Sequence, residues 1–196
     1  MSSPAPHAPL VRSITLVRHG RSAHRGGGWM NAAGLARWRA AYDEAGIVAD
    51  EAPPPALVAL ARASRVVVAS DMRRARESVA RLVDRDVPLE PLLREPDLPV
   101  RVWPRLTLPF AGWALVLGTE WLIESVRRLP PSGEIATQAE AAAEWLAARA
   151  EEHGSVLAVT HAGIRRHVTH VLQSRGWRGP ERRPYAPWSA WTLVRG

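Results

Sequence analysis

The chain contains no cysteine. Disulfide bonds, thiolate metal sites and cysteine nucleophiles are therefore excluded as explanations of its fold or its chemistry. A chain without cysteine is compatible with a reducing compartment, and we expect a cytoplasmic protein.

Lysine is absent as well, so all 26 basic side chains are arginine, and the formal net charge is +7. Two interpretations stay open. The abundance of Ala and Arg can reflect genomic base composition, or the guanidinium groups can serve anion binding through paired contacts with phosphate. A nucleic-acid-binding protein is expected to show a basic stripe. Here the arginines are scattered among Asp and Glu, so we expect no nucleic-acid partner.

Long apolar segments are also missing. The longest stretch without a charge runs from Leu106 to Thr119, contains a proline and two glycines, and is too short to cross a bilayer. We expect a buried or lid-like helix there, with interfacial docking or a homodimer contact as alternatives. Residues 1–12 lack the basic and apolar regions of a signal peptide and are expected to form a flexible tail.

Four apolar runs have the length and the flanking residues of β-strands, and helical periodicity separates them. The first three runs show little polar alternation, which is typical of parallel strands that are covered on both faces. Strands are expected at 13–17, 65–70, 155–161 and 190–195, and helices at 31–47, 54–64, 71–83, 133–154 and 162–176.

Alternating strands and helices predict a three-layer α/β/α sandwich with a mostly parallel central sheet. The length of 196 residues favours a single domain, which we place at 13–196. Residues 96–131 are rich in Pro and Trp and fit no strand–helix repeat. We expect them to form an insertion or lid over the functional site.

Polar side chains follow three of these strands. Arg18 and His19 follow the first strand, Ser70 and Arg74 the second, and His161 the third. Because ligands in such folds bind beyond the carboxyl ends of the strands, one pocket would hold two imidazoles and at least two guanidiniums. These groups suit a dianionic phosphate. A neutral imidazole is also a competent nucleophile near neutral pH.

Three segments at these strand ends carry a family resemblance. The segment "LVRHGRS" (16–22) resembles the Arg-His-Gly signature of the histidine phosphatase superfamily, also called phosphoglycerate mutase-like. The segment "SDMRRARES" (70–78) is similar to its Ser-x-Leu-x-Arg element, with Met72 in place of Leu, and "VLAVTHAGIRR" (156–166) is similar to its late Thr-His-Gly/Ala-Gly strand. The resemblance implies a phosphoglycerate mutase-like fold. It also implies a phosphomonoesterase that acts on a small phosphate ester without a cofactor.

The resemblance also implies roles for individual residues. His19 is the implied nucleophile, which accepts the phosphoryl group. Arg18, Arg74 and His161 are implied to hold the non-bridging oxygens and to supply the charge stabilisation that a metal supplies elsewhere, so no metal is expected. Substrate-binding positions are implied at Gly20, Ser22, Arg25 and Ala162.

The general acid is expected downstream of the second motif, where Glu95 and Asp97 are candidates. Glu95 is preferred because "LLRE" (92–95) resembles the short strand followed by Glu in the phosphatase and mutase branches. Asp97 remains the second candidate. The alternative for Glu95 is a surface carboxylate that pairs with Arg94.

The sequence departs from the family pattern at Arg25, where the commoner signature carries Asn. The glycine-rich stretch around it, residues 24–31, either offers backbone N–H groups to a second anionic group or forms a mobile loop. The apolar, Trp-rich segment 96–131 favours a hydrophobic or aromatic leaving group over a small sugar acid.

Other functions and sites stay open as alternatives. A mutase would return the phosphoryl group to another hydroxyl, and a phospholigand-binding domain would perform no chemistry. His161, His167 and His170 could form a metal cluster, although structural or surface roles are preferred because no carboxylates lie nearby in the sequence. The pair Arg165–Arg166 is interpreted as solvent-exposed.

Overall fold

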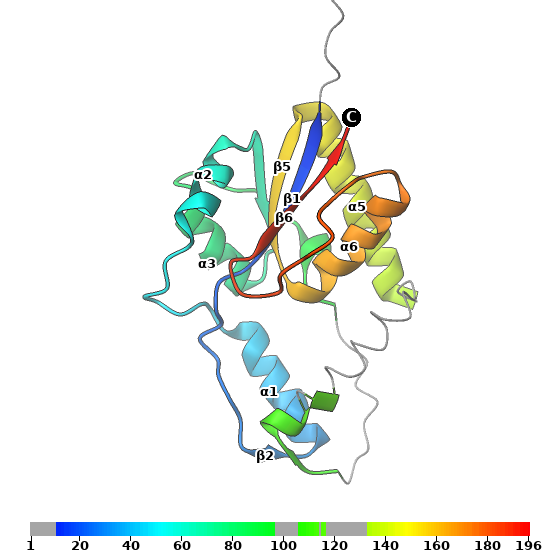
Figure 1. Cartoon of the computed structure of the whole chain (residues 1–196). Coiled ribbons are helices and arrows are strands. Elements are labelled where there is room, and N and C mark those ends of the chain that lie inside the picture. The colour runs from blue at the N-terminus through cyan, green and yellow to red at the C-terminus, as the bar shows by residue number, and fades with distance from the viewer. Residues whose placement is uncertain (1–10, 97–105, 114, 117–132) are drawn as a thin grey trace, which may run out of the picture.

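The central feature of the computed structural model, which describes residues 11–96, 106–113, 115–116 and 133–196, is a four-stranded sheet in the order β3-β5-β1-β6. Strand β5 pairs in parallel with β3 and with β1, whereas β6 runs antiparallel to β1 (Figure 1). The strands are β1 (Arg12–Arg18), β3 (Val66–Ala69), β5 (Ser155–Thr160) and β6 (Ala190–Arg195).

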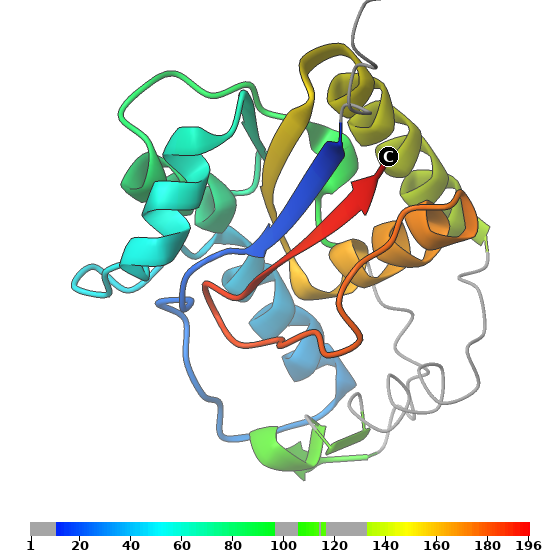
Figure 2. The ribbon, with the colours of Figure 1, turned by 45° about the horizontal axis from the view of Figure 1, so that its top comes forward.

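Helices cover both faces of this sheet. One face carries α2 (Pro55–Ala63) and α3 (Arg73–Leu82), and the other carries α5 (Gly133–His153) and α6 (Ala162–Ser174), as Figure 2 shows. The predicted three-layer α/β/α sandwich with a mostly parallel sheet is therefore confirmed.

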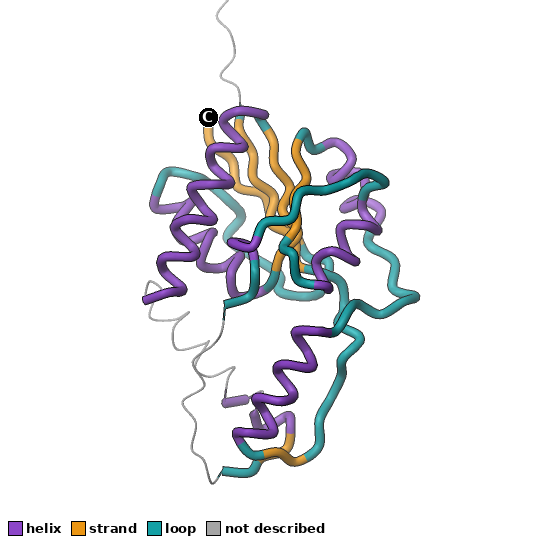
Figure 3. The backbone as a smooth tube through the Cα atoms, turned by 180° about the vertical axis from the view of Figure 1, so that it is seen from behind, coloured by secondary structure: helices purple, strands orange, loops and turns teal. Residues whose placement is uncertain are grey.

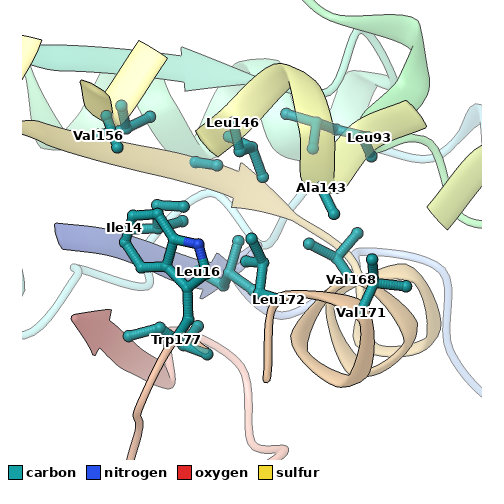
Figure 4. Close-up of a cluster of buried hydrophobic side chains, with 14 of the residues drawn as sticks. Ile14, Leu16, Leu93, Ala143, Leu146, Val156, Val168, Val171, Leu172 and Trp177 are labelled. Carbon is teal, nitrogen blue, oxygen red and sulfur yellow. The ribbon is translucent and has the colours of Figure 1, made fainter. Parts of the chain in front are cut away.

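Two apolar clusters hold the layers together. Ile14 and Leu16 of β1 face α5 and α6, where they pack with Leu146 and Leu172 (Figure 4). Val17 of the same strand belongs to the cluster on the opposite face, beneath α2 and α3. Both faces of the strand are buried, which explains why its sequence shows no polar alternation.

Helix α1 (Ala32–Glu44) lies beyond the carboxyl ends of the parallel strands β1, β3 and β5, away from the layered core (Figures 1 and 3). Its first turn is capped by Asn31, whose side-chain oxygen accepts a hydrogen bond of 2.9 Å from the Gly34 N–H. The helix ends at Glu44, three residues before the predicted end at Ile47. Ile47 instead forms a β-bridge with Ser22.

The described part of the predicted insertion packs near α1. Strand β2 (Trp29–Met30) pairs antiparallel with β4 (Leu108–Pro109), and residues 110–113 and 115–116 are helical. The Trp113 indole N–H donates a 2.7 Å hydrogen bond to the Met30 carbonyl oxygen. Most of the insertion, residues 97–105, 114 and 117–132, lies outside the described residues, as do residues 1–10.

The segment before Glu95 is a 3₁₀ turn, η1 (Pro91–Leu93), and not the expected short strand. Pro91 cannot donate a backbone hydrogen bond to a sheet, and the Glu90 carboxylate caps the turn by accepting 3.0 Å from the Leu92 N–H. Among the described helices, none combines the length and the hydrophobicity needed to cross a bilayer.

Candidate active site

Two histidine side chains lie next to each other at the carboxyl ends of β1 and β5. Arg18 and Thr160 are register partners in these parallel strands, so the next residues, His19 and His161, emerge side by side. Their ring centroids are 5.0 Å apart with an interplanar angle of 55°, and both residues are almost completely buried. Parallel pairing therefore joins two histidines that are 142 positions apart in the sequence (161 minus 19).

Both rings line a cavity of about 140 Å³ at this edge of the sheet. Charged and polar side chains from three strand ends and from α1 surround it. The lining residues are Arg18, His19, Trp38, Arg39, Tyr42, Arg74, Glu95, His161 and Ala162.

Arg74 is held rigidly at the first turn of α3, where it is fully buried. Its guanidinium donates to the Tyr42 carbonyl oxygen and to Asp43 Oδ1, the latter at 3.2 Å. The guanidinium carbon also lies 4.1 Å from the centre of the Tyr42 ring. The last turn of α1 therefore fixes the orientation of this arginine.

Several buried nitrogen atoms around the cavity have no hydrogen-bond partner within the described residues. Nε of Arg18, Nε of Arg74 and Nδ1 of His161 have no hydrogen-bond partner within the described residues, although one Nη of Arg18 donates to the Tyr185 carbonyl oxygen. Buried polar groups of this kind are unfavourable unless a ligand or water satisfies them. An anion with several acceptor oxygens fits this set of donors.

His19 is neutral and presents one unblocked nitrogen. Its Nδ1 lies 2.6 Å from the Gly20 carbonyl oxygen, which can only accept, so Nδ1 carries the proton. Burial, together with the positive charges of Arg74 and Arg18, lowers the pKa of His19 to about 3. The lone pair on Nε2 is therefore available at neutral pH.

His161 is also kept neutral. Burial and the neighbouring His19 hold the pKa of His161 well below its usual range, and Arg74 and Arg18 add to the effect. Its Nε2 lies 3.1 Å from the Ser70 hydroxyl, which follows β3. This contact leaves Nδ1 as the nitrogen without a partner in the described residues.

Glu95 lies against the first turn of α6. Its carboxylate oxygens accept from the Gly163 N–H at 2.9 and 3.2 Å. Burial raises the pKa of Glu95, and this effect exceeds the opposing effects of the Gly163 hydrogen bond and of Arg39 and Arg18. A carboxyl group with a raised pKa beside an anion site has the properties of a general acid.

The alternative interpretation of Glu95, a surface ion pair with Arg94, is wrong. Arg94 forms a two-point contact with Asp71, with Nε at 2.7 Å from Oδ1 and Nη2 at 2.5 Å from Oδ2. Asp97, the second acid candidate, lies outside the described residues.

Three of the four expected substrate-binding positions do not line the cavity, whereas Ala162 does. Ser22 turns away because its backbone pairs with Ile47, and its hydroxyl accepts from the His24 N–H at 3.2 Å. Arg25 is exposed to solvent.

Gly20, the third of these positions, serves the packing of the loop before β6. A Cβ at Gly20 would lie 2.5 Å from Cζ2 of Trp188, so only glycine fits beneath that indole. The Gly20 N–H donates a 2.9 Å hydrogen bond to the Ser78 hydroxyl of α3. The Gly20 backbone therefore lies close to protein atoms, Trp188 on one side and Ser78 on the other.

The interpretation of Arg165 as solvent-exposed is wrong. The residue is fully buried, and its guanidinium donates 2.8 Å hydrogen bonds to the carbonyl oxygens of Ser189 and Pro184. It also lies 4.0 Å from the centre of the Trp191 ring. Burial and the neighbouring Arg18 lower the pKa of Arg165 to about 9.

The sequence motifs did not identify three residues of α1 that line the cavity, Trp38, Arg39 and Tyr42.

The alternative of a metal cluster formed by His161, His167 and His170 is wrong. In the part of the chain that the structure describes, no three His, Asp or Glu side chains are grouped so as to hold a metal ion.

No protein-family model and no curated protein matches this sequence. Solved structures do match. A phosphoglycerate mutase from Bacillus anthracis str. Sterne is 16% identical with a TM-score of 0.59, covering 94% of this chain and 88% of that one. The chain has the phosphoglycerate mutase-like fold.

Two further structures with the phosphoglycerate mutase-like fold come from mycobacteria. A glucosyl-3-phosphoglycerate phosphatase in complex with VO3 is 17% identical, with a TM-score of 0.57 and coverage of 94% of this chain and 96% of that one. A protein described as mycobacterial hydrolase 2 is 19% identical, with a TM-score of 0.58 and coverage of 94% and 82%. At these identities the likeness concerns the fold, and the chemistry must be argued from the cavity.

The cavity of this phosphoglycerate mutase-like fold combines three chemical features. It holds a neutral imidazole with a free lone pair, guanidinium and imidazole nitrogens without partners in the described residues, and a carboxyl group with a raised pKa. Together they can bind a tetrahedral oxyanion, attack its central atom and deliver a proton to a leaving oxygen.

Proposed function

We propose that this chain is a phosphomonoesterase of the histidine phosphatase superfamily, which acts without a metal through a phosphohistidine at His19. The observation that carries the proposal is the neutral His19 ring, with Nε2 unblocked, inside a cavity that Arg18, Arg74 and His161 also line. The three sequence motifs and the shared fold support the same assignment.

In the first step, His19 Nε2 attacks phosphorus. The new N–P bond forms as the P–O bond to the alcohol breaks, and the electron pair of that bond leaves with the oxygen. Glu95 donates its proton to this oxygen, so a neutral alcohol departs. The Nε donors of Arg18 and Arg74 bind the non-bridging oxygens, on which negative charge is concentrated, and His161 Nδ1 joins them when the Ser70 hydroxyl donates to Nε2 and the proton is on Nδ1.

In the second step, water attacks the phosphorus of phosphohistidine. Glu95, now ionised, takes a proton from this water, and the N–P bond breaks with its electrons returning to His19 Nε2. Inorganic phosphate leaves, and both side chains return to their starting states. The raised pKa of Glu95 suits this exchange, because the carboxyl group must hold a proton in one step and accept one in the next.

The comparisons support this reaction class because one neighbour in fold is a phosphatase whose structure contains VO3, and another is a phosphoglycerate mutase. A mutase is the second candidate. It would return the phosphoryl group from His19 to a different hydroxyl of the substrate, so inorganic phosphate would not accumulate.

Hydrolysis of p-nitrophenyl phosphate in the presence of a chelator tests the proposal. We expect His19→Ala to lose at least about 10³-fold in kcat/KM, since removing the nucleophile removes the covalent route. His170→Ala is the matched control, because His170 is an exposed histidine of α6 outside the cavity. Equal rates for wild type and His19→Ala would refute the covalent mechanism, and loss of the wild-type rate in chelator would refute metal independence.

A further inference from the structure

The wall of the cavity beyond the histidines is built by a single helix turn. Trp38, Arg39 and Tyr42 of α1 line the cavity together with the strand-end residues. Arg18 and the two histidines come from the ends of β1 and β5, so a phosphate group that they bind lies on the sheet side of the cavity. The alcohol part of its ester must therefore lie against α1 and Glu95.

The aromatic part of this wall is fixed by its neighbours. The rings of Trp38 and Tyr42 are stacked, with centroids 5.2 Å apart and an interplanar angle of 17°. Phe110 packs on Trp38 at 4.7 Å and His24 at 5.2 Å, while the Trp38 indole N–H donates to the Gly26 carbonyl oxygen. Because the rings are held in place before a ligand arrives, binding against them requires little further ordering.

The charged part of the wall is also fixed. Arg39 Nε donates to Asp43 Oδ2 at 3.1 Å, and its Nη2 donates to the Pro96 carbonyl oxygen at 3.2 Å. A guanidinium that is held in this way beside the rings offers a planar cation to a bound group. Aromatic rings interact favourably with such a cation through their π-systems, and saturated groups do not.

Among the described residues, the wall offers few side-chain acceptors to a polyhydroxylated group. Of the described lining residues, only Glu95 carries a carboxylate, whose oxygens already accept from the Gly163 N–H, only Tyr42 carries a hydroxyl, and none carries an amide. A sugar or glycerol moiety would leave several hydroxyl donors without protein acceptors.

We propose that the substrate is the phosphate ester of an alcohol with an aromatic ring at or next to the ester oxygen, such as an aryl or arylmethyl phosphate, an inference that rests on the proposed function. The Arg74 guanidinium and the Trp38 ring cover the two faces of Tyr42, so the substrate ring meets the edges of this aromatic wall and lies beside the Arg39 guanidinium. Aromatic pairs and cation–π contacts of this kind discriminate a flat π-system from a saturated ring of similar size by about 3- to 10-fold.

Binding of two non-hydrolysable phosphonates tests this inference without any turnover. Isothermal titration calorimetry compares benzylphosphonate with cyclohexylmethylphosphonate, which match in charge and closely in size. We expect the benzyl compound to bind wild-type protein about 3- to 10-fold more tightly. In Trp38→Leu the preference should fall below about 2-fold, whereas Trp29→Leu should keep it, because Trp29 is 74% exposed and does not line the cavity. Equal dissociation constants for the two compounds on wild type would overturn the inference.

Hydrolysis of the corresponding phosphate esters separates this failure from failure of the proposed function. If benzyl phosphate and cyclohexylmethyl phosphate are hydrolysed with equal kcat/KM in a reaction that needs His19, the phosphatase assignment stands and the aromatic preference is wrong. If neither phosphonate binds, the cationic cavity does not hold a phosphoryl group, and both proposals are wrong.

Discussion

Replacing Glu95 by Gln separates proton donation from phosphate binding. Glutamine keeps the size of the side chain and can still accept from the Gly163 N–H, but it has no proton to give at neutral pH. General acid catalysis contributes roughly 10² to 10⁴ in rate. We therefore expect Glu95→Gln to reduce kcat/KM by about 10² to 10³ for an alkyl phosphate, which is about 3 to 4 kcal/mol of barrier. For p-nitrophenyl phosphate the loss should be less than about 10-fold, because a stable phenolate leaves without a proton.

The same substitution lowers activity but should not lower the stability of the folded protein at pH 7. Burial raises the pKa of Glu95 in the folded protein. The folded state is therefore more stable when the Glu95 carboxyl group is protonated than when it is ionised. That stabilisation is fully present below the usual pKa of glutamate and is lost as the pH rises through the raised value. Because Gln never ionises, Glu95→Gln should be at least as stable as wild type at pH 7 and should lose any advantage near pH 4.

Two assays on one set of proteins check both effects. Initial rates at substrate concentrations well below KM give kcat/KM for an alkyl and an aryl phosphate, and thermal unfolding at pH 7 and pH 4 gives the stability. Glu144→Gln, which makes the same change at an exposed position on α5, should alter neither. Equal losses of kcat/KM on both substrates would refute proton donation by Glu95. A large drop in the melting temperature of Glu95→Gln at pH 7 would refute the effect of the raised pKa on stability.

Three further predictions concern the cavity and its supports. Arg74→Gln should reduce kcat/KM by about 10² to 10³, the usual effect of removing one charge-stabilising donor, and a loss below 10-fold would exclude this role. Gly20→Ala should reduce the free energy of unfolding by about 1 to 3 kcal/mol, measured in urea, because its Cβ overlaps the Trp188 ring; an unchanged midpoint would contradict this packing. Burial lowers the pKa values of His19, His161 and His167 in the folded protein, so the unfolded state binds more protons below about pH 6.5. The free energy of unfolding should therefore decrease as the pH is lowered. His19 and His167, with pKa values of about 3 and about 4 in the folded protein, should each account for about 2 kcal/mol between pH 7 and pH 5, and His167→Gln should remove its share of that difference.

The layered fold was predictable because each strand carries its own local signal. Apolar runs without alternation, such as 155–161, identify strands buried on both faces, and this property requires helices on either side of a parallel sheet. The convergence of His19 and His161 followed from the same reasoning, since parallel neighbours end at the same edge. The 3₁₀ turn before Glu95 did not follow, because a proline and a capping carboxylate decided the local backbone.

The α1 side of the cavity could not be predicted, because it depends on where a helix outside the sheet is placed. Trp38 and Tyr42 have the spacing of an ordinary packing face, and nothing in that spacing shows that the face borders a ligand. Arg165 shows the converse problem. Its guanidinium is satisfied by the carbonyl oxygens of Ser189 and Pro184, which lie about 20 residues away in the sequence. Because nothing near Arg165 in the sequence indicates these acceptors, the sequence predicted an exposed arginine.

The most direct measurement is to trap the phosphorylated enzyme with an aryl phosphate in Glu95→Gln. The first step hardly needs the acid with this substrate, whereas hydrolysis of the N–P bond lacks its base, so the intermediate should accumulate. We predict a burst of one aryl alcohol per active site and, after alkaline quenching, a phosphoryl group on the peptide that contains His19. Turnover without a burst, or a phosphoryl group on the peptide that contains His161 or Ser70 instead, would contradict His19 as the nucleophile.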